Sequence, residues 1–307
     1  MKRAKVIFLV GPTAVGKTGL SIPLAKKIGA QIISCDSMQV YKGMDILSSK
    51  PTAAQRAAVA HHLLGIVSPE DEFNVSEYRR RALKAIKTII NLGRIPLFVG
   101  GSGLYMSIVV DGIFEVKTED PRVRARLFKQ AREQGSAALH ARLQEVDPPA
   151  ARKIHPNDTK RIVRALEVFA VAGVPISRLQ QTRKGLDKEY DVRIIGLDMD
   201  RDILYERINR RVEEMFDQGL VKEVKRLLKK KLSRTAACAI GIQEVKSYLE
   251  GGLDEQGAKE LMQRNTRRYA RRQMTWFRKD RRIVWVKVGP GIAKSVILQK
   301  IVKRNKS

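Results

Sequence analysis

The chain has 307 residues, more than one compact domain usually contains, so we expect a main core with one added unit. Its 60 Lys and Arg residues exceed its 32 Asp and Glu residues, and the net charge of +28 favours a polyanionic partner, nucleic acid rather than a membrane. The absence of a long apolar run excludes a membrane span, so we expect a cytoplasmic protein, and we also expect a monomer. Cys35 and Cys238 are far apart and form no CxxC pair, which argues against a disulfide framework or a zinc module, so both are expected to be buried thiols.

Strands and helices alternate in the first part of the chain. Apolar runs rich in β-branched residues predict strands at 5–10, 31–35 and 95–99, and apolar spacing predicts helices at 20–29 and 76–92. Such alternation indicates an α/β fold, in which a parallel sheet is covered by helices on both faces.

The strand signal disappears between residues 121 and 181, where helical patterns follow one another. Strand patterns return at 192–199 and 283–288. We therefore expect a helical insertion domain at 121–181 that contacts nucleic acid, within a catalytic core formed by 1–120 and 182–307.

A phosphate-binding loop follows the first predicted strand. The stretch GPTAVGKT fits G-x-x-x-x-G-K-[ST], and its members are Gly11, Pro12, Thr13, Ala14, Val15, Gly16, Lys17 and Thr18. Its backbone N–H groups and Lys17 would hold phosphate oxygens, and the Thr18 hydroxyl is the expected Mg²⁺ ligand. The core is therefore predicted to be like that of P-loop NTPases. The identity of the nucleotide or diphosphate stays open, because the strand at 95–99 ends in glycines rather than in an acidic metal ligand.

Asp36 ends the second predicted strand, at the edge where parallel sheets bind ligands, and is the candidate general base. A role in capping its own loop is the alternative. Asp198 and Asp200 could instead supply the metal ligand of an NTP hydrolase. Adjacent His61 and His62 could suggest a metal site. We expect them to be structural residues of a helix instead, since neighbouring residues on a helix point to different sides.

Two predicted helices are strongly basic. The stretch NTRRYARRQMTWFRKDRR predicts a helix with a stripe of arginines for phosphate contacts, beside aromatic residues for base stacking, and a solvated face is the alternative. The stripe consists of Arg267, Arg268, Arg271 and Arg272, flanked by Tyr269, Trp276 and Phe277. A helix that begins near Asp158 carries Lys160, Arg161 and Arg164 as a second basic edge.

Blocks along nearly the whole chain resemble the bacterial tRNA dimethylallyltransferases. They include GPTAVGKT, DSMQVYKGMDI, HHLLGI, FNVSEY, LFVGGSGLYM, NDTKRIVRALEVF and RRQMTWFRKD, in the order of the family. The resemblance implies transfer of a dimethylallyl group from dimethylallyl diphosphate to N6 of adenine 37, in tRNAs that read codons beginning with U. It also implies Mg²⁺ as cofactor and the anticodon stem-loop of tRNA as partner.

The same resemblance assigns roles to residues. The P-loop would hold the donor's diphosphate, with Lys17 and a Thr18-bound Mg²⁺ neutralising charge, and Asp36 would accept the proton of N6. The expected tRNA-binding residues, besides the arginine stripe, are Asp36, Ser37, Met38, Gln39, Ser102, Arg124, Lys160, Arg161, Ile162, Val163 and Arg164.

The chain departs from the family pattern in places. It has MDILSSKP where the family commonly has MDIGTAKP, and Ile242, Gln243 and Glu244 stand where the family has Tyr-Lys-Glu or Tyr-Arg-Gln. A basic residue is thus missing near the expected crevice. If it normally helps to bind diphosphate, Arg207, Arg211 or another Arg would have to replace it, or the affinity for the donor would be lower. The alternatives are an adenylate isopentenyltransferase that acts on free adenine nucleotides, a P-loop small-molecule kinase, and a non-catalytic RNA-binding ATPase or GTPase. The basic tail and the insertion favour tRNA.

Overall fold

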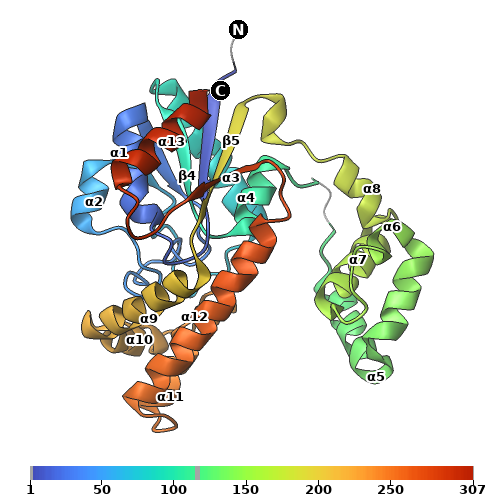
Figure 1. The fold of residues 1–307 in the computed structure, drawn as a ribbon. Helices are drawn as coiled ribbons and strands as arrows, with labels where there is room; N and C mark the ends of the chain where they lie inside the picture. The colour runs from blue at the N-terminus through green and yellow to red at the C-terminus, as the bar shows by residue number, and fades with distance from the viewer. Residues whose placement is uncertain (1–2, 115–117, 307) are drawn as a thin grey trace. The chain divides into compact units, whose positions relative to one another are not determined.

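A parallel sheet forms the centre of the core in the computed structural model, which describes residues 3–114 and 118–306 (Figure 1). Within these residues the sheet has six strands in the order β3-β2-β4-β1-β5-β6, and every neighbouring pair is parallel. The strands are β1 (Lys5–Val10), β2 (Ala30–Ser34), β3 (His61–His62), β4 (Ile95–Gly100), β5 (Asp191–Asp198) and β6 (Ile283–Lys287). The expected α/β fold is confirmed.

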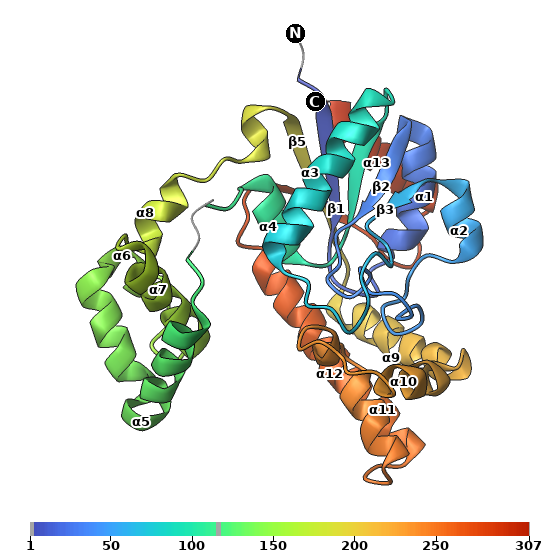
Figure 2. The ribbon, with the colours of Figure 1, turned by 180° about the vertical axis from the view of Figure 1, so that it is seen from behind.

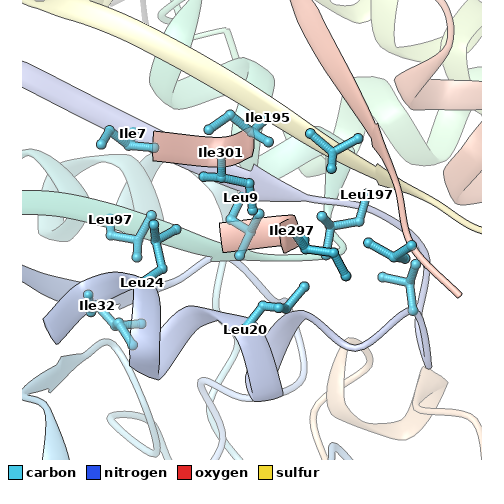
Figure 3. Packing of buried hydrophobic residues seen from close by; sticks show 14 of the residues in the cluster. Ile7, Leu9, Leu20, Leu24, Ile32, Leu97, Ile195, Leu197, Ile297 and Ile301 are labelled. Carbon is cyan, nitrogen blue, oxygen red and sulfur yellow. The ribbon is translucent and has the colours of Figure 1, made fainter. Parts of the chain in front are cut away.

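The strand β1 lies inside the sheet because its side chains are apolar on both faces. Ile7 and Leu9 point to the face covered by α1 (Lys17–Ile28) and α13 (Lys294–Lys306), where Figure 3 shows them packed with α1 and α13 side chains. Phe8 points to the opposite face and stacks on Phe98 of β4, with ring centroids 4.4 Å apart. That face is covered by α3 (Val75–Asn91) and α4 (Gly103–Val110), as Figure 2 shows.

Four further helices pack together beyond the carboxyl edge of the sheet (Figure 1). They are α9 (Arg201–Asp217), α10 (Leu220–Leu228), α11 (Ile242–Leu249) and α12 (Glu255–Phe277). The loops that follow β1, β2 and β4 begin at the same edge, so side chains from α9 and α12 are available to a site there.

A separate compact unit spans 111–188, and the core consists of 1–110 and 189–307. The unit holds α5 (Pro121–Val146), α6 (Pro148–Ala151), α7 (Thr159–Ala172) and α8 (Ile176–Gln181) around its own buried apolar cluster. It begins before and ends after the expected insertion of 121–181, because the segments that flank the helices belong to it. Gly135, with φ of 81°, divides α5 into two helical parts.

The expectation that His61 and His62 lie on a helix is wrong. Both residues form the edge strand β3, and they pair with Ile32 and Ile33 of β2. The short helix α2 (Ala53–Ala58) ends before them. None of the helices in the described part of the chain is long and apolar enough to span a membrane.

Candidate active site

The P-loop connects β1 to α1 and bends sharply at two glycines. Gly11 has φ of 149°, and a Cβ there would lie 2.9 Å from the carbonyl oxygen of Leu197, so only glycine fits. Gly16 has φ of 100° at the start of α1. The Nζ of Lys17 donates to the carbonyl oxygens of Gly11 and Pro12 at 2.9 and 2.7 Å. The loop is thus shaped to present N–H groups and a lysine to an anion.

A cavity of about 340 Å³ opens beside the P-loop, and we call it the first cavity. Thr13, Lys17 and Thr18 of the P-loop line it, opposite side chains of α9. The cationic residues in its wall are Lys17, Arg207, Arg210 and Arg211, and the carboxylates are Asp36 and Glu214. The excess of cations fits a ligand with several negative charges, such as a diphosphate.

A second cavity of about 230 Å³ adjoins the first. Its wall is mainly apolar, with Leu47, Ile208, Val212, Met215, Ile240 and Met262 among the lining residues. Both cavities are lined by Thr13, Asp36, Ser48, Ser49, Arg211 and Tyr269. The carboxylate of Asp36 therefore lies where a phosphate-binding space meets a space suited to an apolar or aromatic group.

Asp36 follows β2 and is fixed by its own loop. Its Oδ1 accepts hydrogen bonds from the backbone N–H groups of Met38 at 2.9 Å and Gln39 at 3.4 Å. Below it, the hydroxyl of Tyr78 donates to the carbonyl oxygen of Ser34 at 2.9 Å. The capping role and the catalytic role are therefore compatible: Oδ1 holds the turn, and no hydrogen bond to Oδ2 is found among the described residues.

The guanidinium of Arg211 stands between the two cavities. Its Nε donates to Ser49 Oγ at 2.9 Å, and its Nη1 donates to Thr13 Oγ1 at 3.1 Å. Desolvation lowers the pKa of Arg211, against the opposing charge of Asp36. No carboxylate forms an ion pair with Arg211 within the described ranges, so its charge is available to a bound anion.

The chain lacks the basic residue that the family has at position 243, but other basic residues line the first cavity. Arg207 and Arg211, the expected replacements, both line the first cavity. Gln243 is exposed and lines neither cavity, while Ile242 is buried at the start of α11. The position of Gln243 therefore lies outside both cavity walls, and Arg207 and Arg211 supply cationic groups to the first cavity.

Gln273 connects the P-loop to α12 and was not found by sequence reasoning. Its Oε1 accepts from the backbone N–H of Thr13, and its Nε2 donates to the carbonyl oxygen of Gly101, both at 2.9 Å. A Cβ on Gly101 would lie 2.2 Å from that Nε2, so a larger residue there would displace the Gln273 amide. The only signal in the sequence was a polar residue on the buried side of an amphipathic helix.

Glu223 of α10 is a second residue that the sequence did not reveal. Its buried carboxylate accepts hydrogen bonds from the backbone N–H groups of Asp45 and Ile46 at 3.0 Å and of Leu47 at 2.8 Å. These bonds hold the loop whose next residues, Ser48 and Ser49, line both cavities.

Burial lowers the pKa of Lys17 to about 7, while Asp36 raises it and Arg211 lowers it further. Only the protonated amine attracts a phosphate, so affinity for an anion should fall as the pH rises above 7. A bound anion favours the charged form, and we expect a proton to be taken up on binding at pH 8.

Calorimetric titration with inorganic pyrophosphate in Hepes and in Tris at pH 8 measures that uptake, because the two buffers differ in ionisation enthalpy. Lys17→Met is the control, since it reports the protonation change of pyrophosphate alone. Equal buffer dependence of the wild type and Lys17→Met would contradict the prediction.

The four arginines of the stripe on α12 differ in their exposure to solvent. Arg267 is half-buried and donates to Asn209 Oδ1 of α9, whereas Arg268 and Arg271 are exposed. Arg272 is exposed, lines the second cavity, and lies 5.7 Å from the centroid of the Tyr269 ring. Three of the four guanidinium groups are thus open to an RNA. Ser102 lies at the start of α4, where its Oγ accepts from the N–H of Tyr105.

The residues expected to bind tRNA from the helical unit differ in exposure. Lys160 and Arg161 are exposed on α7. Arg124 and Arg164 each donate to the buried carboxylate of Glu167 at 3.0 Å, so they stabilise the unit. Ile162 and Val163 are buried in its apolar core, and direct contact with RNA does not fit these two residues.

Other expectations are corrected or unsupported. Cys35 is buried, and burial raises its pKa to about 12. Cys238, in the connection between α10 and α11, is exposed, so the expectation that it is buried is wrong. Asp198 and Asp200 line neither cavity, and Asp200 caps α9 through the N–H of Asp202. Among the described residues, no group of three His, Cys, Asp or Glu side chains could hold a metal ion.

Two family profiles match the chain. The profile described as IPP transferase matches residues 39–280, and the profile described as isopentenyl transferase matches residues 4–65. The tRNA dimethylallyltransferase of Geobacter sulfurreducens is 47% identical over 286 residues, which cover 92% of each chain. The Bacillus subtilis enzyme of the same name is 44% identical over 290 residues, which cover 94% of this chain and 92% of the relative.

Solved structures of related enzymes are similar to this chain over nearly its whole length. The tRNA isopentenylpyrophosphate transferase of Bacillus halodurans superposes with a TM-score of 0.72 at 38% identity, covering 99% of this chain and 97% of the other. A eukaryotic dimethylallyltransferase described as acting on tRNA gives a TM-score of 0.75 at 28% identity, covering 92% of this chain and 74% of the other. The similarity therefore extends over both the core and the helical unit.

Proposed function

The chain belongs to the IPP transferase family and, within it, to the tRNA dimethylallyltransferases, and we propose that its two joined cavities hold the two substrates of dimethylallyl transfer. The acceptor is N6 of adenine 37 in tRNAs that read codons beginning with U, and the products are N6-dimethylallyladenosine and diphosphate. The observation that carries the proposal is the position of Asp36, which lines both a cationic cavity and a mainly apolar one.

The first cavity would bind the diphosphate of dimethylallyl diphosphate. The P-loop N–H groups, Lys17 and Arg211 converge there, and they would stabilise the negative charge that grows on the leaving diphosphate. The Thr18 hydroxyl fits a Mg²⁺ ion that is held mainly by substrate phosphates and water, since Mg²⁺ needs few protein ligands in such sites. The ion would supply further neutralisation of the leaving group.

The second cavity would receive the adenine. A base inside the anticodon loop is stacked, so it must leave the stack to reach Asp36. Ser37 and Met38 line this cavity beside Asp36, and Gln39 lines the first. As N6 bonds to C1 of the dimethylallyl group, the bond from C1 to the diphosphate oxygen breaks, and the N6 proton passes to Asp36.

Transfer of label from labelled dimethylallyl diphosphate, with Mg²⁺ present, tests the proposal. We expect label in an anticodon stem-loop with adenine at position 37, and none in AMP or in a stem-loop with guanine there. Label in AMP alone would instead support the adenylate isopentenyltransferase alternative, and label in neither acceptor would contradict prenyl transfer.

Loss of charge from the exposed part of the arginine stripe should weaken tRNA binding and reduce its dependence on salt. If Arg268 and Arg271 each contact one phosphate, Arg268→Gln with Arg271→Gln lowers the slope of log affinity against log salt by about 1.4 to 1.8. Binding titrations from low to moderate salt measure the slope. Lys229→Gln with Lys231→Gln removes the same charge from exposed positions after α10 and is the control. Equal slopes for the two double variants would contradict the role of the stripe.

A further inference from the structure

One face of α12 leads from the cavities toward the surface. Arg272 and Gln273 follow Tyr269 by three and four residues, and Trp276 follows them by four and three, so each lies beside Tyr269 or Trp276 on one side of the helix. Tyr269 lines both cavities, Arg272 the second and Gln273 the first. Trp276 lies about 10 Å further along the helix axis than Tyr269, a distance that a few nucleotides of one strand can span.

The indole of Trp276 is exposed but fixed in place. Trp276 is 40% exposed, and Leu104 at the start of α4 is 46% exposed. A Cβ on Gly103 would lie 2.3 Å from Trp276 Cδ1, so the indole packs directly on the backbone of Gly103. Phe277, the next residue, is fully buried and anchors this end of α12 in the core. A large aromatic side chain that is exposed to solvent but fixed by packing indicates a binding role.

The charge around Trp276 favours RNA over a protein partner. Exposed Arg272 lies one helical turn before it and Lys279 follows it, while Asp280 is already paired with Arg282 at 2.7 Å. An aromatic face beside guanidinium groups is the combination that holds an unstacked base and its phosphate. A protein interface would need a wider apolar patch than Trp276 and Leu104 provide.

We propose that Trp276 is a stacking platform for a base next to the target adenine, so that the flanking nucleotide is held while the adenine occupies the second cavity. The inference rests on the proposed tRNA acceptor. It extends that function by naming a residue outside both cavities that selects an unstacked RNA strand.

The fluorescence of Trp276 tests the contact directly. Trp276 and Trp285 are the two tryptophans, so Trp285→Phe leaves Trp276 as the single reporter. We expect the anticodon stem-loop to change its emission and to shield it from acrylamide, and inorganic pyrophosphate to do neither. An indole that is already shielded in the free protein, or that does not respond to the stem-loop, would overturn the proposal.

Steady-state kinetics separates stacking from a structural role. Trp276→Ala should raise KM for the stem-loop about tenfold or more, with kcat and KM for dimethylallyl diphosphate nearly unchanged. Trp276→Phe should restore part of the loss, and Leu249→Ala, which removes a similarly exposed side chain from α11, should change none of these values. An unchanged KM for the stem-loop, or an equal change in KM for the donor, contradicts stacking.

The fluorescence titration can be read whether or not the wild type prenylates the stem-loop. Absence of prenylation contradicts the proposed function, and absence of a fluorescence response contradicts the role of Trp276.

Discussion

Asp36→Asn should lower the rate of dimethylallyl transfer by about 10²- to 10⁴-fold and leave tRNA affinity nearly unchanged. The amide can still accept from the N–H groups of Met38 and Gln39 through its oxygen, so the loop should keep its shape. It cannot take the proton of N6. Single-turnover rates with saturating tRNA and donor measure the loss without a contribution from product release.

Two control measurements test whether Asp36 acts as the general base of the reaction. Asp198→Asn alters another carboxylate at the carboxyl edge of the sheet, at the end of β5. Asp198 lines neither cavity, so this variant should keep near-normal turnover. Asp36 also raises the pKa of Lys17, so donor affinity of Asp36→Asn needs to be measured separately. Near-normal single-turnover rates in Asp36→Asn would reject Asp36 as the base.

Local patterns predicted the part of the site that is local in sequence. The P-loop and Asp36 each follow an apolar strand, and parallel strands bring their carboxyl ends to one edge, so their proximity followed from the fold class. The order of the strands did not follow, because pairing of β1 with both β4 and β5 depends on packing across the whole chain.

Contacts between distant segments were not predictable from the sequence. Gln273 reaches the N–H of Thr13 from 260 residues away, and Glu223 holds the N–H of Leu47 from 176 residues away. Both are polar residues of amphipathic helices, where the same pattern also fits a solvated side chain. Ile162 and Val163 were expected to bind tRNA because they belong to the same motif as the basic residues of α7. They are buried instead, and they anchor that helix in the core of its unit.

Arg211→Met should reduce kcat/KM for dimethylallyl diphosphate about 10²- to 10³-fold without lowering the Tm of the free protein. In the free protein the guanidinium is desolvated and bonded to two hydroxyls, Thr13 Oγ1 and Ser49 Oγ, rather than to a carboxylate. Removing such a charge costs the fold little, because no ion pair is broken. The diphosphate, in contrast, loses a donor that reaches both cavities.

A loss of activity without a loss of stability is the distinctive outcome. Arg210→Met is the matched control, because Arg210 also lines the first cavity but is mostly exposed and lies 3.5 Å from Glu214. It should change kcat/KM far less, since solvent screens its charge. Arg211→Lys keeps the charge but not the fork of donors, so partial activity would show that the geometry of the guanidinium matters. A fall in Tm that accompanies the loss of activity in Arg211→Met would mean that Arg211 supports the loop at Ser49 rather than the leaving group.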